Sequence, residues 1–112
     1  MRIVGYLDRQ ATDVTAFGST EVRFSPLTRI GEGGVAVLRV GGGGEIGRHP
    51  AAMDQLFVVL AGRGSVCGGD GTWQSVEAGQ AVLWAAGEEH TTRADEPLVA
   101  IVIEASQAVV GG

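Results

Sequence analysis

The segment that decides the fold runs from Gly43 to Gly62 and reads GGEIGRHPAAMDQLFVVLAG. It holds His49, one of two histidines in the chain, followed by Gln55 and by an apolar run that ends at Gly62. Glycine reaches backbone angles that cost other residues strain, so a short apolar run that ends at a glycine is typical of a β-strand leading into a tight turn.

A second segment of the same kind runs from 79 to 94 and reads GQAVLWAAGEEHTTRA, with the other histidine, His90, near its end. Residues two apart in a strand share a face, so Gln55 lies with Phe57 and His90 lies with Thr92. If these faces point into one barrel, His49, Gln55 and His90 converge although they lie far apart along the chain.

The rest of the chain is predicted to be nearly all β. No long window has the 3.6-residue apolar period of a helix, and short stretches rich in Val, Ile, Leu and Phe are separated by glycine-rich turns. The candidate strands are 22–25, 34–40, 45–49, 55–60, 64–67, 72–76, 81–84, 90–93 and 98–104. So many short strands fit a barrel or sandwich better than an open sheet, and a small barrel encloses space for one ligand or ion.

Two stretches lie outside these strands. The run Gly41–Gly44 is predicted to form a mobile loop at one mouth of the barrel, and a plain linker turn is an equal alternative. Residues 1–20 are expected to form an N-terminal arm that covers a sheet edge or crosses to a second subunit. A homodimer is therefore expected.

Composition limits the classes of protein to which the chain can belong. Its 112 residues, 45% hydrophobic, fit one domain over 1–112. The net charge of −5 and eight scattered arginines with no lysine argue against nucleic acid and anionic membrane surfaces as partners. The longest apolar runs fall far short of the roughly 20 residues that span a bilayer. Asp8, Arg9 and Asp13 interrupt any apolar signal-peptide core, so a cytoplasmic location is expected.

The two glycine-spaced segments together resemble the paired motifs of the cupin superfamily, over roughly 34–104. In that family the first motif has two histidines and a glutamate between glycines, and the second has a proline, a glycine, a histidine and an asparagine. Here Ala51 replaces the second histidine and Gln55 the glutamate, while Ala85 replaces the proline and Ala94 the asparagine. The framing glycines of the pattern are all present, at Gly43, Gly62, Gly79 and Gly87.

The resemblance implies an all-β fold, the double-stranded β-helix or jelly-roll barrel. It also implies a metal held by three histidines and one glutamate, of which this chain keeps His49 and His90. With Gln55 as a neutral oxygen ligand, the site is expected to bind a transition metal such as Zn, Ni, Mn or Fe weakly, and a metal-free barrel is the alternative.

Several other residues are candidates for the site. Apolar walls with few polar groups are typical of binding cavities, and the candidate wall residues double as plain core residues. They are Met53, Phe57, Trp84, Thr92 and Ile101. Glu88 shares strand parity with His90, which makes it a weak candidate for orienting the imidazole or for a general base; a solvated loop is the simpler interpretation.

Three functions remain open from the sequence. The first is a barrel that binds a small molecule of unknown identity, with a weakened metal site. The second is a metal-dependent enzyme of the dioxygenase or isomerase type that uses His49, Gln55 and His90. The third is a non-catalytic dimeric scaffold or sensor. No catalytic serine triad, phosphate loop or dinucleotide fingerprint is present in the sequence.

Overall fold

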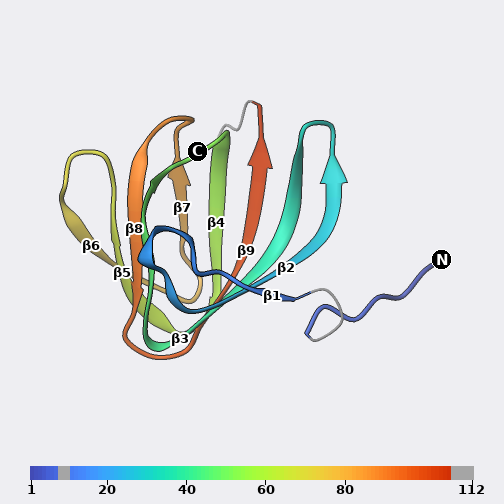
Figure 1. Ribbon diagram of the computed structural model, residues 1–112, viewed down its shortest axis with the longest axis horizontal. Coiled ribbons are helices and arrows are strands. Elements are labelled where there is room, and N and C mark those ends of the chain that lie inside the picture. Colours follow the sequence, from blue (N-terminus) through green and yellow to red (C-terminus); the bar gives the residue numbers. More distant parts are fainter. Residues whose placement is uncertain (8–10, 107–112) are drawn as a thin grey trace.

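The computed structural model describes residues 1–7 and 11–106, and these form a nearly closed barrel of antiparallel strands (Figure 1). The predicted all-β jelly-roll fold is confirmed. The elements in chain order are β1 (Thr12–Asp13), the short 3₁₀ turn η1 (Ala16–Gly18), β2 (Thr20–Ile30), β3 (Gly33–Pro50), β4 (Asp54–Ala61), β5 (Arg63–Cys67), β6 (Trp73–Glu77), β7 (Ala81–Trp84), β8 (Glu89–Ala94) and β9 (Leu98–Ala105).

The long strand β3 organises the barrel because it pairs with three neighbours. Its first part, residues 34–40, pairs with β9, and its last part, residues 45–50, pairs with β8. On its other edge it pairs with β2 along most of its length. The strand order β6-β5-β8-β3-β9-β4-β7 follows from this change of partner, with β2 and β1 added beside β3.

The glycine run of residues 41–44 is part of β3, so the predicted mobile loop is wrong. The run lies where β3 leaves β9 and joins β8, and the pairing with β2 shifts register there. A side chain would not fit at Gly44, because its Cβ would lie 2.7 Å from the carbonyl oxygen of Thr20. Gly43 adopts a φ of +81°, which favours glycine. The glycines therefore form a bulged corner of a strand.

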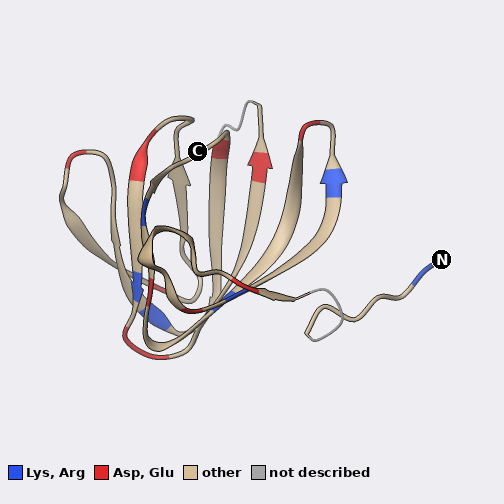
Figure 2. Cartoon of the chain, in the orientation of Figure 1, with Lys and Arg blue, Asp and Glu red and all other residues tan. Residues whose placement is uncertain are grey.

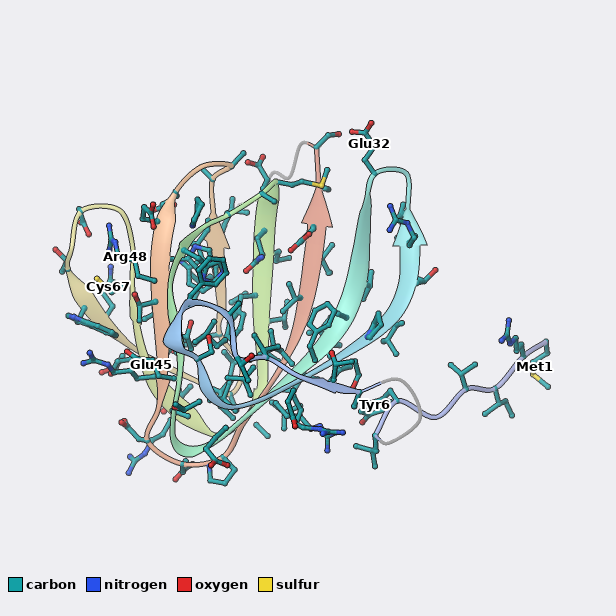
Figure 3. All side chains as sticks on the ribbon, viewed as in Figure 1. Met1, Tyr6, Glu32, Glu45, Arg48 and Cys67 are labelled. Atoms are coloured by element: carbon teal, nitrogen blue, oxygen red, sulfur yellow. The ribbon has the colours of Figure 1, made fainter. Side chains whose placement is uncertain are left out.

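The N-terminal region has two described parts. Residues 1–7 project away from the barrel, with Met1 at the far end (Figures 1 and 3). Among the described residues, a hydrogen bond of 2.7 Å from the Arg39 guanidinium to the carbonyl oxygen of Leu7 ties this segment to the barrel. Residues 11–20 lie against the barrel, where β1 pairs with β2. Asp8 and Arg9, on which the localisation prediction drew, lie outside the described residues.

The core fills the inside of the barrel, where alternate residues of each strand point inward. In β9 the inward residues are Leu98, Ala100 and Val102, each at most 4% exposed. Phe57 and Val59 of β4 are equally buried, as their shared parity predicts. In the described part of the chain, no helix is long and apolar enough to cross a membrane.

Candidate functional site

The two histidines are direct neighbours across the β3–β8 pair. His49 lies opposite His90 in the register, and their ring centroids are 4.3 Å apart. Both lie at the barrel end where β3 finishes and β8 starts. The structure therefore brings together the two residues that the sequence separates by a whole inter-motif segment.

Each imidazole is held by a backbone carbonyl two residues earlier in the chain. Nδ1 of His49 lies 2.7 Å from the carbonyl oxygen of Gly47, and Nδ1 of His90 lies 3.0 Å from that of Glu88. A carbonyl oxygen only accepts, so Nδ1 carries the proton in both rings and Nε2 of the neutral ring is an acceptor. His90 is 2% exposed, and this burial lowers its pKa from the usual value of 6.5. The neutral form of His90 is thereby favoured.

Aromatic rings enclose the histidine pair on both sides. Trp84 stacks on His90 at a centroid distance of 4.2 Å, and Phe17 stacks on His49 at 4.8 Å. Phe57 meets Trp84 edge to face. The faces of the imidazoles are thus covered, which leaves their Nε2 edges as the groups that can meet a ligand.

Gln55 lies beside Trp84 on one strand and beside Glu104 on the other. Its side-chain amide nitrogen donates a hydrogen bond of 3.0 Å to Glu104 Oε1. Glu104 continues the inward parity of β9 beyond Val102, so its carboxylate belongs to the barrel interior. The acidic group that is absent at position 55 is therefore present nearby, on a different strand.

These groups line a cavity of about 160 Å³ inside the barrel. The wall is mostly apolar, and the polar groups lie among the histidines, Gln55, Thr92 and Glu104. A second hollow of about 220 Å³ adjoins it along β2 and β3 and shares Phe24, Val102 and Glu104. The described lining residues of the first cavity are Val14, Phe17, Val22, Phe24, Leu38, Ile46, His49, Gln55, Phe57, Trp84, His90, Thr92, Val102 and Glu104.

The structure places three of the sequence candidates outside this lining. Ile101 alternates with Ala100 and Val102 and so faces outward, and Met53 precedes β4 without reaching the described lining. The Glu88 carboxylate accepts hydrogen bonds of 3.1 Å from the backbone N–H groups of Gly69 and Ala85. The Glu88 side chain therefore connects two turns, and the hydrogen bond to His90 is made by the Glu88 backbone carbonyl.

Sequence reasoning missed the N-terminal part of the wall. Four lining residues, Val14, Phe17, Val22 and Phe24, come from the β1–β2 region. Val22 and Phe24 gave a usable signal, because they lie two residues apart in a predicted strand and therefore share a face. Phe17 gave no signal, because it belongs to a short turn in which its own φ is +60°.

The family resemblance implies a metal ion, but the described residues provide only part of the ligand set that the family uses. The two free Nε2 atoms suit a transition metal, and carbonyl anchoring of Nδ1 is common among metal-binding histidines. Within the described ranges, however, no three His, Cys, Asp or Glu side chains lie close enough together to hold a metal ion. Ala51 stands where the family has a second histidine, and Gln55 offers a neutral carbonyl oxygen in place of a carboxylate, so the four-ligand set of the family is not met.

Comparison with known proteins agrees with the fold. Residues 34–104 match the family model Cupin_2, described as a cupin domain. No curated protein sequence matches this chain significantly. Among solved structures, the polyketide cyclase RemF from Streptomyces resistomycificus aligns with a TM-score of 0.79 at 20% identity, covering 96% of this chain and 80% of that one.

Two further structures are similar to the chain. A predicted oxalate decarboxylase from Thermotoga maritima aligns with a TM-score of 0.78 at 17% identity, covering 91% of this chain and 96% of the other. The Cnp3 cupin domain from Schizosaccharomyces pombe aligns with a TM-score of 0.75 at 16% identity, covering 95% and 76%. At these identities the likeness concerns the fold, which hosts enzymes and binding proteins alike.

Proposed function

The chain belongs to the cupin domain family, and we propose that this member binds one small, largely apolar organic molecule inside its barrel, beside His49 and His90. The observation that carries the proposal is the cavity itself, in which an apolar wall surrounds a small cluster of polar groups. That combination is typical of small-molecule sites. Its volume of about 160 Å³ resembles that of an engineered cavity of about 150 Å³ that holds benzene.

A cavity-filling variant tests this proposal. Val102 lies on the cavity wall and is 4% exposed, so Val102→Phe should occupy the space that a ligand would need. Ile103→Phe is the matched control, because Ile103 is the next residue of β9 and points to the opposite face. A thermal-shift screen of small organic molecules should give stabilising compounds for the parent protein and for the control. It should give none for Val102→Phe.

Equal stabilisation of both variants by the same compounds would place binding outside the cavity and contradict the proposal. An absence of stabilising compounds across a broad library would favour a scaffold role. The screen therefore separates a binding barrel from a barrel that serves as structure alone.

A second candidate function is that of a metal-dependent enzyme using His49, Gln55 and His90. The observation in its favour is the anchoring of both imidazoles through Nδ1, which presents two Nε2 atoms to one space. Elemental analysis of protein purified without chelator tests it. Near-stoichiometric transition metal that is lost in His49→Ala would support this candidate, and metal-free protein would contradict it.

A further inference from the structure

The described polar groups of the cavity include no lysine or arginine side chain. The charged group among them is the Glu104 carboxylate. The two imidazoles present Nε2 lone pairs, because their Nδ1 protons are used by Gly47 and Glu88. A ligand group that reaches the histidine pair must therefore supply a hydrogen-bond donor.

Neutral donors are also present beside these acceptors. The Thr92 side chain carries a hydroxyl, and Gln55 retains one N–H after its bond to Glu104. A group that donates to an imidazole and accepts from a neutral donor matches both kinds of partner. A hydroxyl group does this with a single oxygen atom.

The rest of the wall defines the body of the ligand. Phe57, Val22 and Val102 are each at most 4% exposed and present apolar surface to the cavity. The volume of about 160 Å³ corresponds to a single six-membered ring. A larger molecule would have to extend into the adjoining hollow past Glu104.

We propose that the cavity selects a neutral ring molecule that bears a hydroxyl group, of the phenol type, with the hydroxyl donating to Nε2 of His49 or His90. This inference rests on the proposed function and names the class of molecule that the cavity takes. The ring lies against the apolar wall, and the hydroxyl oxygen accepts from the neutral donors nearby.

Charge excludes two related classes of ligand. An anion would face the Glu104 carboxylate and find no cationic partner among the described lining residues. Acidic segments of β4, β8 and β9 also gather at the barrel end that holds the histidines (Figure 2). An organic cation would lose its hydration in the mostly apolar cavity, and pairing with the single Glu104 carboxylate would repay that loss only in part.

Four probes of similar size test the proposal by isothermal titration calorimetry on protein freed of metal with a chelator. They are phenol, toluene, benzoate and benzylamine. Toluene is more apolar than phenol, so burial alone would favour toluene. The hydroxyl makes two hydrogen bonds, each worth about fivefold in affinity, against about fourfold for burial of the toluene methyl group, so phenol is expected to bind about sixfold more tightly than toluene. Benzoate and benzylamine are expected to bind more weakly than phenol.

The outcomes separate this inference from the proposed function. If toluene binds as tightly as phenol, or if benzoate or benzylamine binds best, the inference is wrong although the cavity binds small molecules. If phenol binds only after Zn²⁺ is added, a metal and not an imidazole receives the hydroxyl, which also overturns it. If no probe binds, the proposed function is contradicted together with the inference.

Two variants identify the acceptor. His49→Phe and His90→Phe each keep a flat ring in the aromatic stack and remove one Nε2 acceptor. The preference for phenol over toluene is expected to disappear in one of them, while toluene still binds. Retention of the full preference in both variants would contradict the proposal. Should either variant fail to fold, the four-probe series on the parent protein still decides the question.

Discussion

Gln55 donates its side-chain N–H to Glu104 across the β4–β9 pair, at 3.0 Å, inside the barrel. This bond couples the two positions: the carboxylate of Glu104 makes a neutral amide the favourable side chain at position 55. A glutamate there, as in the family motif, would place two carboxylates together.

Gln55→Glu is therefore expected to lower the free energy of unfolding at neutral pH, by about 1–3 kcal/mol, because one carboxylate loses its donor and gains a like charge. Urea unfolding at pH 7 measures this loss. Gln74→Glu on the exposed face of β6 is the control, and an equal loss there would contradict the explanation.

The buried imidazole of His90 predicts a direction for pH dependence. Its pKa is lowered in the folded protein relative to 6.5, chiefly by burial. Below pH 6.5 the unfolded chain binds a proton at His90 more readily than the folded protein does, so acid favours unfolding. The stability that depends on neutral His90 is fully present above pH 6.5 and is lost as the pH falls. The free energy of unfolding should therefore rise with pH up to that value and then level off. His90→Gln should remove this part of the slope, and an unchanged slope would contradict the assignment.

Gly47 keeps Phe17 in place over His49. The backbone N–H of Gly47 donates to Ser19 Oγ, and a Cβ at Gly47 would overlap the carbonyl oxygen of Phe17. Gly47→Ala should displace the turn that carries Phe17 and lower the free energy of unfolding by about 1–3 kcal/mol. Gly5→Ala, where a Cβ meets nothing within 4 Å, should leave stability unchanged. Thermal unfolding of both variants tests this, and equal melting temperatures would contradict it.

Glu88 serves as a link between turns. Glu88→Ala removes the carboxylate that accepts from two backbone N–H groups. It should lower the free energy of unfolding by about 1–3 kcal/mol, while the affinity for a cavity ligand stays unchanged. Glu89→Ala is the matched neighbour, because its contact with Arg48 is an exposed pair at 3.8 Å and should contribute little. If Glu88→Ala abolished ligand binding without affecting stability, a direct role in the site would replace this explanation.

The strands were predictable where their apolar runs are uninterrupted. The predicted strand 98–104 nearly coincides with β9, and 55–60 lies within β4. The glycine corner of β3 was not predictable, because a glycine run has the same composition in a loop and in a crowded strand corner. The far half of β2 is exposed from Leu27 to Ile30, so burial imposed no periodic pattern on it.

The candidate site was predictable only in part. His49, Gln55 and His90 stood out by residue type and by spacing, and the structure gathers them around one cavity. Glu104 did not stand out, because its partner Gln55 is 49 residues away and only the β4–β9 register joins them. Phe17 depends on a turn conformation that no periodicity reports.

The most direct measurement of the central claim is the set of intermolecular nuclear Overhauser effects between bound phenol and the isotope-labelled protein. The account predicts contacts from the ring protons to Val22, Phe57 and Val102, which enclose the cavity. It also predicts that Val102→Phe removes them. Contacts restricted to residues outside the cavity wall, or none at saturating phenol, would contradict the claim that the barrel interior is the binding site.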